Sequence, residues 1–268
     1  MPEQIGLIGL GAMGSALLQG FLTAGAAPDR IIAADIEAAK LEQAAADYRI
    51  KTGEISAVAA AARFIFLAVK PQDMQSLLLQ LSPLLQPPQV VVSVAAGVTI
   101  KQIEAVLPAQ IGVIRVMPNT PCLIKQGVLA VSAGQYVAET DLRLVECWLK
   151  NMGSVHIVPE KLLDAVTGVS GSGPAYVYLF LEALADGGVL AGLPRVLAQE
   201  LAVETVLGAA LMVKETAEHP ALLREMVTSP GGTTAAALFA LEKGGFRALL
   251  QQAVQAAAER SKELGKHD

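Results

Sequence analysis

Short apolar runs alternate with segments of helical spacing through the first part of the chain, up to about Pro159. A strand buried on both faces of a parallel sheet is apolar throughout, and helices return the chain between such strands. The pattern predicts strands at Gln4–Ile8, Ile31–Ala34, Phe64–Val69, Val90–Val94, Ile111–Met117 and Leu129–Ser132. It predicts helices at Ser15–Ala24, Ala38–Ala46, Met74–Leu81 and Ile100–Val106. We therefore expect a doubly wound α/β domain over residues 1–159.

The pattern changes at Glu160, after which apolar and polar residues follow helical spacing only. The predicted helices are Tyr176–Leu190, Arg195–Glu215, Thr234–Lys243 and Phe246–Leu264. Proline favours the first helical position, and Pro174, Pro194 and Pro220 all stand where a helix is expected to begin. The string 170–174 predicts a helix break with Ser172 as N-cap. Residues 160–268 are thus predicted to form an all-helical second domain.

The composition is strongly apolar, with 53% hydrophobic and 17% charged residues and a mean hydropathy of +0.49. Such a chain either spans a membrane or hides apolar surface against copies of itself. The charge-free stretch Gln4–Pro28 is interrupted by glycines, whereas a membrane span needs about 20 mainly apolar residues. Because the predicted C-terminal helices are apolar on more than one face, we expect no membrane and an obligate oligomer built through these helices.

Charge and cysteine content argue against several further classes of protein. The net charge is −5 and the pI is near 5.3, so no basic surface for nucleic acid is expected. A signal peptide is not expected, because no Lys or Arg precedes the first apolar stretch. Cys122 and Cys147 have no CxxC spacing and the three histidines are scattered, which favours reduced thiols and no metal. We therefore expect a cytoplasmic protein.

The first predicted strand leads directly into Gly9-Leu10-Gly11-Ala12-Met13-Gly14, and a helical segment follows. A strand, GxGxxG and a helix in this order are the dinucleotide-binding fingerprint of a Rossmann-type domain, although a glycine turn without a ligand is the alternative. Gly9 would make the tight turn, Gly11 would admit the pyrophosphate, and Gly14 would let the helix pack on the strand. The helix N-terminus would offer N–H groups to the phosphates. We predict NADPH or NADH as the cofactor.

Asp35 bears on the choice between these cofactors, since it ends the second predicted strand 21 residues after Gly14. A carboxylate there accepts the ribose hydroxyls of NAD and repels a 2′-phosphate. Lys40 lies one helical turn further on and could compensate. The sequence favours NADH with NADPH as the alternative, while a strand-end or N-cap role for Asp35 stays open.

Further loops follow later strands, at the sheet edge where open α/β sheets bind ligands. They are Ala68-Val69-Lys70-Pro71, Ala95-Ala96-Gly97 and the segment around Asn119. Lys70 is a candidate for a phosphate or ribose contact, and Asn119 for the nicotinamide end. The small Ala95–Gly97 run would let a flat ring lie against the backbone. Each loop taken alone could also be a plain strand-to-helix turn.

With these loops in place, the whole chain resembles the pyrroline-5-carboxylate reductases. The resemblance rests on GLGAMG at 9–14, AVKPQ at 68–72, SVAAGVT at 93–99, RVMPNTP at 115–121, AVTGVSGSGPAYVY at 165–178, EMVTSPGGTTAAAL at 225–238 and EKGGFRALL at 242–250. It implies NAD(P)H-dependent reduction of 1-pyrroline-5-carboxylate to L-proline, the last step of proline biosynthesis. It also implies that residues 160–268 bind the substrate and associate, as a dimer or a decamer.

The string SPGGTT at 229–234 is where the resemblance places the substrate. Its glycines stand directly before a helix, so the N–H groups of Gly232, Thr233 and Thr234 could converge on the substrate carboxylate. The resemblance assigns Thr234 a catalytic contact with the ring nitrogen, and Ser229 a contact with the carboxylate. The alternative is a turn with a helix cap. Glu160 matches a family position near the substrate and the nicotinamide, or else carries a favourable first-turn helix charge.

Two rival functions are also compatible with parts of the sequence. A β-hydroxyacid dehydrogenase has a similar GLGxMG start but needs a catalytic lysine in the second domain, and no lysine follows Gly168 until Lys214. A non-enzymatic nucleotide-sensing protein would keep the fold and lose turnover. The intact SPGGTT string argues against this second alternative.

Overall fold

The computed structural model describes residues 3–265, which divide into two compact units. The sheet unit comprises residues 3–172 and 256–265, and the helical unit comprises residues 173–255. The sheet unit thus runs past the predicted boundary at Pro159, where the Glu160 carboxylate accepts the Ile100 N–H. Where the substrate-binding and oligomerisation segment begins stays a prediction.

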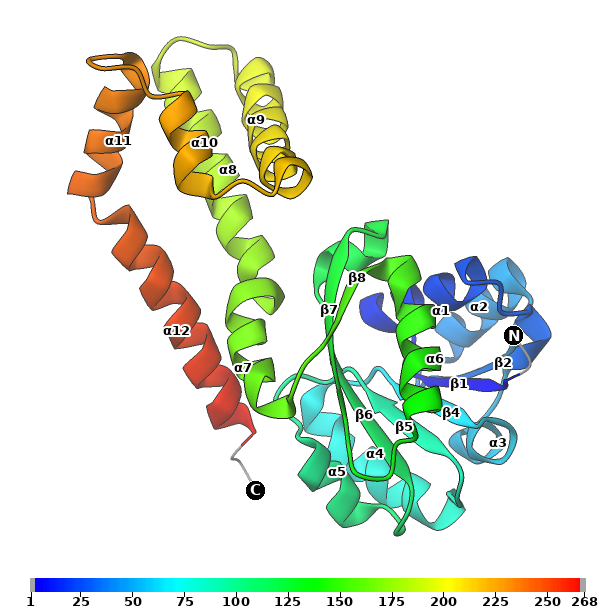
Figure 1. Cartoon of the computed structure of the whole chain (residues 1–268). Coiled ribbons are helices and arrows are strands. Elements are labelled where there is room, and N and C mark those ends of the chain that lie inside the picture. The colour runs from blue at the N-terminus through cyan, green and yellow to red at the C-terminus, as the bar shows by residue number, and fades with distance from the viewer. Residues whose placement is uncertain (1–2, 266–268) are drawn as a thin grey trace. The chain divides into compact units, whose positions relative to one another are not determined.

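The sheet unit is built on one eight-stranded sheet with the order β3-β2-β1-β4-β5-β6-β7-β8 (Figure 1). The strands are β1 Ile5–Ile8, β2 Ile31–Ala34, β3 Lys51–Thr52, β4 Phe64–Leu67, β5 Val90–Ser93, β6 Gly112–Met117, β7 Gly127–Ala133 and β8 Gly153–Ile157. Neighbouring strands run parallel except β6 and β7, which are antiparallel. The predicted α/β class is confirmed, and the sheet departs from the expected parallel arrangement at the β6–β7 pair.

Helices connect and cover the strands of this unit. The α-helices are α1 Ala12–Thr23, α2 Ala38–Tyr48, α3 Ile55–Ala61, α4 Met74–Leu81, α5 Ile100–Val106, α6 Glu139–Leu149 and α7 Leu163–Val166. The short 3₁₀ helices are η1 Pro28–Arg30, η2 Pro71–Asp73, η3 Ser82–Leu84, η4 Thr120–Ile124, η5 Lys150–Met152 and η6 Glu160–Leu162. A π-helical turn, η7 Thr167–Gly171, follows α7.

Alternate residues of each buried strand enter two different cores. Phe64 and Phe66 of β4 pack with α1 and α6, whereas the intervening Ile65 packs with α3, α4 and α5 on the other face. Both faces of the sheet are therefore covered, as a doubly wound fold requires. The centre of the first core is Trp148, which is fully buried and meets the Phe64 ring edge-on at a centroid distance of 5.0 Å.

The helical unit contains α8 Gly173–Leu190, α9 Arg195–Thr216, α10 Pro220–Met226, α11 Thr233–Lys243 and the first part of α12 Phe246–Leu264. In residues 173–255, all of which the structure describes, the buried residues are Ala185, Ala198 and Ala202, where α8 and α9 pack together. Large apolar side chains are exposed instead, including Leu190 at 90% and Phe239 at 71%. This unit has no apolar core of ordinary size within one chain.

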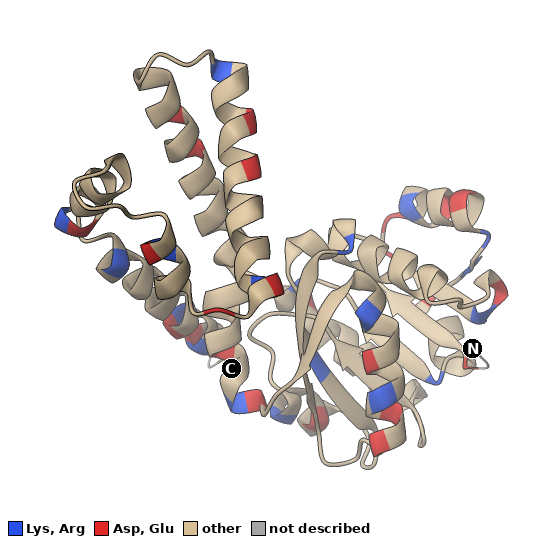
Figure 2. Ribbon diagram, turned by 45° about the horizontal axis from the view of Figure 1, so that its top comes forward, with Lys and Arg blue, Asp and Glu red and all other residues tan. Residues whose placement is uncertain are grey.

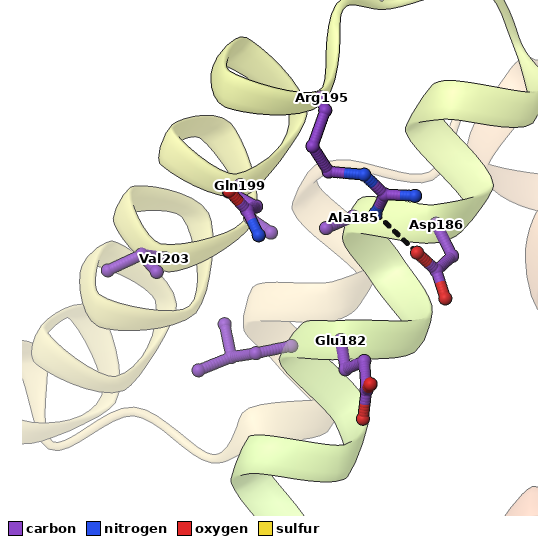
Figure 3. Close-up of a pocket in the computed structure, with 8 residues that line it drawn as sticks. Glu182, Ala185, Asp186, Arg195, Gln199 and Val203 are labelled. Atoms are coloured by element: carbon purple, nitrogen blue, oxygen red, sulfur yellow. Dashed lines mark hydrogen bonds and ion pairs between the residues drawn. The ribbon is translucent and has the colours of Figure 1, made fainter.

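A groove of about 510 Å³ lies between α8 and α9 (Figure 3). It is lined by apolar and charged side chains, among them Leu181 and Val203. At one end the Arg195 guanidinium of α9 forms an ion pair with the Asp186 carboxylate of α8. Figure 2 shows long uncharged stretches along these helices. The groove itself is of mixed character, because Glu182 and Gln199 also line it.

Among the helices in residues 3–265, α9 is long and apolar enough, by length and composition alone, to cross a membrane. Its mean hydropathy is 1.6 over the most apolar window, and 11% of that window is buried. The same values are expected for a soluble-protein helix that a second subunit covers.

We expect the purified protein to sediment as an assembly of at least two chains of 27.8 kDa, because the helical unit leaves most of its large apolar side chains in solvent. Analytical ultracentrifugation over a range of concentrations measures this. A folded, monodisperse monomer would contradict it.

Candidate active site

The three glycines of the fingerprint occupy three different environments at the end of β1. Gly9 has a φ of +97°, and a Cβ added to it would lie 2.6 Å from the Ala68 carbonyl oxygen. A Cβ at Gly14 would lie 1.9 Å from the Gly9 carbonyl oxygen, so the close packing of α1 on this turn requires glycine. A Cβ at Gly11 would meet nothing within 4 Å. Open space over Gly11 is what an approaching pyrophosphate requires.

Gly11 is also the N-cap of α1 and provides no side-chain hydrogen bond to the first helical N–H groups. Those N–H groups belong to Ala12 and Met13 and carry the positive end of the helix dipole. Ala12 is exposed and Met13 partly exposed. The residues of the loop therefore fit a dinucleotide whose phosphates bind at the helix N-terminus.

Asp35 braces this loop from the end of β2. One carboxylate oxygen accepts the Leu10 N–H at 2.5 Å, and the other accepts the Glu37 N–H at 2.8 Å. The N-cap of α2 is Glu37, so Asp35 is not itself the cap that one interpretation expected. Each carboxylate oxygen keeps a second lone pair, so contact with ribose hydroxyls remains chemically open.

Lys40 is engaged beside Asp35. Its ammonium lies 2.5 Å from the Glu37 carboxylate. The hydrogen bond with Glu37 raises the pKa of Lys40, and the negative charges of Glu37 and Asp35 act in the same direction. Lys40, which the sequence offered as compensation for a 2′-phosphate, is therefore paired with a carboxylate.

The predicted edge loops lie together at the carboxyl ends of neighbouring strands. The Ala68 N–H bonds to the Ile8 carbonyl, and the Val94 N–H bonds to the Leu67 carbonyl, which joins the ends of β1, β4 and β5. Ala68 packs against the glycine loop, as the distance from Gly9 showed. Val69 is partly exposed, and Lys70 and Pro71 are exposed at the start of η2.

The loop after β5 is less open than its composition suggested. Ala95 and Gly97 are buried and Ala96 is partly exposed. Gly97 has a φ of +79°, and a Cβ there would lie 3.0 Å from the Leu264 Cβ at the end of α12. One side of this loop is therefore covered by the C-terminal helix.

Asn119 joins three segments at the end of β6. Its Nδ2 donates to the Ser170 carbonyl at 3.0 Å, and its Oδ1 accepts the Val128 N–H at 2.9 Å. The residue is 8% exposed, and these bonds leave one amide N–H for any further partner. The amide thus holds β7 and the π turn at this edge, and the predicted contact with nicotinamide stays a prediction.

Glu160 is tied to the sheet unit by its carboxylate. One oxygen accepts the Ile100 N–H at the start of α5 at 2.7 Å and lies 3.1 Å from the Arg115 guanidinium. Arg115 is 4% exposed, and a buried cation requires such a partner. Because this carboxylate is hydrogen-bonded to α5, Glu160 does more than place a favourable negative charge in the first turn of its own helix. The predicted substrate contact of Glu160 stays a prediction.

The break expected at 170–174 is a bend at the single residue Ser172, between η7 and α8. The Ser172 N–H bonds to the Thr167 carbonyl at 2.8 Å, which closes a π turn, and α8 begins at the next residue. A Cβ at Gly171 would lie 2.5 Å from the Met117 methyl carbon. The glycine therefore allows the π turn to pack closely against the end of β6.

The SPGGTT segment forms a tight loop before α11 in the helical unit. Gly231 has a φ of +69°, and the Gly232 N–H bonds to the Ser229 carbonyl at 3.0 Å. The Gly232 N–H is thus used within the loop, although it was expected to face an anion. The N–H groups at the helix start belong to Thr233, which is exposed, and Thr234, which is half-buried. Ser229 is exposed.

Sequence reasoning did not single out Arg115, Gln102 or the end of α12. Arg115 had a usable signal, since it is the one charged residue in the apolar run Ile111–Met117. The contact of Leu264 with Gly97 had none, because the two residues are far apart in the chain. In residues 3–265, no three His, Cys, Asp or Glu side chains cluster as a candidate metal site.

A mostly parallel sheet with a braced glycine loop at its carboxyl edge defines a dinucleotide-binding oxidoreductase fold. Residues 4–97 match the family model described as NADP oxidoreductase, coenzyme F420-dependent. Residues 160–264 match the model for pyrroline-5-carboxylate reductase dimerisation.

Relatives match over the full length. The pyrroline-5-carboxylate reductase of Synechocystis sp. is 45% identical over 268 residues, which cover 99% of this chain and 100% of the relative. The pyrroline-5-carboxylate reductase of Pisum sativum is 44% identical over 264 residues, which cover 97% of this chain and 95% of the relative. The protein therefore belongs to the pyrroline-5-carboxylate reductase family and is an oxidoreductase.

Solved structures agree with this assignment. The pyrroline-5-carboxylate reductase of Coxiella burnetii superposes with a TM-score of 0.93 at 35% identity and covers 99% of this chain and 100% of its own. The pyrroline carboxylate reductase of Plasmodium falciparum, solved with NADP bound, superposes with a TM-score of 0.89 at 33% identity, and 99% of each chain is covered. The expected resemblance is confirmed, and the hydroxyacid dehydrogenase and the non-enzymatic sensor are set aside.

Replacing Gly11 by valine should lower affinity for NADH at least tenfold, because the side chain would occupy the open space over the helix N-terminus. Since nothing in the protein lies within 4 Å of the new Cβ, the melting temperature should change by less than about 3 °C. Titration of NADH and thermal unfolding measure the two effects. A folded Gly11→Val variant with normal NADH affinity would place the coenzyme elsewhere.

Proposed function

We propose that this protein reduces 1-pyrroline-5-carboxylate to L-proline with NADPH or NADH, the last step of proline biosynthesis. The observation that carries the proposal is the full-length relationship to pyrroline-5-carboxylate reductases. The braced glycine loop and the formed SPGGTT loop supply local support. The activity is tested by mixing the purified protein, the imine and reduced coenzyme and measuring L-proline directly.

The coenzyme, when bound, supplies a hydride to the carbon of the substrate's C=N bond. The electrons of that bond move to nitrogen, so a substrate that enters as the iminium ion leaves as the amine without a proton from the protein. No nucleophile or strong acid is needed, and the task of the chain is to orient the substrate and exclude water. Orientation of this kind contributes about 7–11 kcal/mol to lowering a barrier.

The start of α11 is proposed to hold the substrate. The N–H groups of Thr233 and Thr234 and the positive end of the helix dipole favour a carboxylate, and the Ser229 hydroxyl can donate a further bond. The Thr234 hydroxyl both donates and accepts, so it suits a ring nitrogen in the imine and amine states. We propose Thr234 as the catalytic residue and assign Glu160 a place near the same substrate.

The coenzyme is proposed to bind along the sheet edge that the residues 9–14, 35, 68–71, 95–97 and 119 form. NADH is the proposed preference, although the Plasmodium falciparum relative was solved with NADP. The support comes from the two carboxylates at the end of β2 and from the pairing of Lys40 with Glu37. Negative charge here disfavours a 2′-phosphate.

We propose that the chain assembles as a dimer through its helical unit, with the dimer as the building block of any decamer. The dimerisation model covers the helices whose apolar side chains are exposed. A partner subunit on α9 would account for its apolar surface without a membrane. A cytoplasmic location and the absence of nucleic-acid partners also remain predictions.

Thr234→Ala should lower kcat about ten- to a hundredfold, because the ring nitrogen loses its orienting hydroxyl. The Kd for NADH should stay within twofold of the wild type. Thr234→Ser keeps the hydroxyl and should recover most of the rate, and Thr216→Ala, which removes an exposed hydroxyl from α9, serves as the control. An unchanged kcat in Thr234→Ala would remove this residue from the mechanism.

The ratio of kcat/KM for NADH to that for NADPH should exceed one in the wild type. Glu37→Gln should raise kcat/KM for NADPH about two- to fivefold, because it removes one negative charge and releases Lys40. Glu42→Gln removes the same charge from the exposed surface of α2 without touching Lys40 and is the matched control. A strong preference of the wild type for NADPH would refute the role given to Asp35 and Glu37.

A further inference from the structure

The last turn of α12 lies directly on the loop that follows β5. A Cβ on Gly97 would approach the Leu264 Cβ to 3.0 Å, and a Cβ on Gly265 would lie 2.7 Å from the Gly97 carbonyl oxygen. Both backbones are therefore packed as closely as glycine allows. All of these residues belong to the sheet unit.

Gln102 connects the two segments through both ends of its amide. Its Oε1 accepts the Thr99 N–H at 2.8 Å and completes a capping box at the start of α5. Its Nε2 donates to the Gly265 carbonyl at 3.0 Å. The orientation of the amide follows from these partners, since the N–H of Thr99 requires an acceptor and the carbonyl of Gly265 requires a donor.

A second contact fixes the same turn of α12 to the sheet unit. The Ser261 hydroxyl donates to the Asp164 carboxylate at 2.7 Å, and Ser261 is 4% exposed. Asp164 lies in α7, shortly after Glu160, whose carboxylate accepts the Ile100 N–H. The start of α5 is thus held both by the end of α12 and by the segment 160–164.

We propose that residues 261–265 form a positioning strap for the loop 95–97, and that Gln102 is the positioning residue that connects them. The proposal rests on the proposed function, in which this loop lies against the nicotinamide end of the coenzyme. Gly97 has a φ of +79°, and an unrestrained glycine can also adopt other backbone conformations. The strap restricts the loop to this conformation, so that the binding surface for the ring is formed before the coenzyme arrives.

A positioning role makes a selective prediction. A loosened loop weakens contacts with the nicotinamide end and leaves the adenosine and pyrophosphate contacts on the glycine loop intact. NADH binding should therefore suffer, whereas binding of ADP-ribose, which lacks the nicotinamide ring, should not. A general loss of protein stability would weaken the binding of NADH and of ADP-ribose together.

Gln102→Glu is the informative variant. A carboxylate still accepts the Thr99 N–H, so the capping box is kept, but it meets the Gly265 carbonyl with an acceptor in place of a donor. We expect the Kd for NADH to rise about three- to tenfold, with the Kd for ADP-ribose and the KM for the imine within twofold of the wild type. Gln80→Glu makes the same chemical change on the exposed surface of α4 and should alter none of these values.

Ser261→Ala tests the strap without introducing charge and should raise the Kd for NADH about two- to fourfold while sparing ADP-ribose. An equal rise in the Kd values for NADH and ADP-ribose, or no change in NADH binding in either variant, would overturn the proposal of a positioning strap. Binding is measured by calorimetry without turnover. If the wild type fails to form proline, the proposed function fails, whereas the two ligand affinities still decide whether the end of α12 controls the loop.

Discussion

The approach of α1 to the end of β1 is the constraint on which the coenzyme site depends. A Cβ at Gly14 would lie 1.9 Å from the Gly9 carbonyl oxygen, so any side chain there would force the helix away from the sheet. The same turn is held from the side by Asp35, which accepts the Leu10 N–H. The loop is therefore formed by contacts within the protein, and a dinucleotide meets helix N–H groups that are already in place. Such preorganisation reduces the entropy lost on binding.

The two compact units differ in how they are stabilised. The sheet unit buries apolar side chains on both faces of its sheet, whereas the helical unit buries only alanines in residues 173–255. The helical unit must therefore be stabilised by association, since exposing this much apolar surface to water is unfavourable. The SPGGTT loop lies in this unit, so the order of the proposed substrate site is linked to assembly.

Much of the fold could be predicted from the sequence because its signals are local. The apolar runs predicted β1, β2, β4, β5, β6 and β7, and the strand-GxGxxG-helix order predicted the coenzyme loop. The strand β8 was missed because Gly153–Ile157 alternates and carries exposed polar residues such as His156. The antiparallel pairing of β6 with β7 was also missed, since an apolar run carries no information on the direction of its neighbour.

The parts of the site that the sequence could not predict are long-range. Asn119 was identified as an edge residue, but its bonds to Val128 and Ser170 depend on how distant segments fold together. The pairing of Glu160 with Arg115 is of the same kind. The contact of Gly97 with Leu264 joins the middle of the chain to its end. A linear pattern identifies which residues are unusual, whereas only the folded chain shows which partners they use.

Hydride transfer to the imine carbon is the central claim, and isotope tracing measures it most directly. The protein is incubated with 1-pyrroline-5-carboxylate and NADH deuterated at both C4 positions, and the product is examined by NMR and mass spectrometry. The account predicts L-proline with a single deuterium on the ring carbon next to nitrogen that was the imine carbon. Proline without deuterium at that carbon, or coenzyme oxidation without proline, would contradict it.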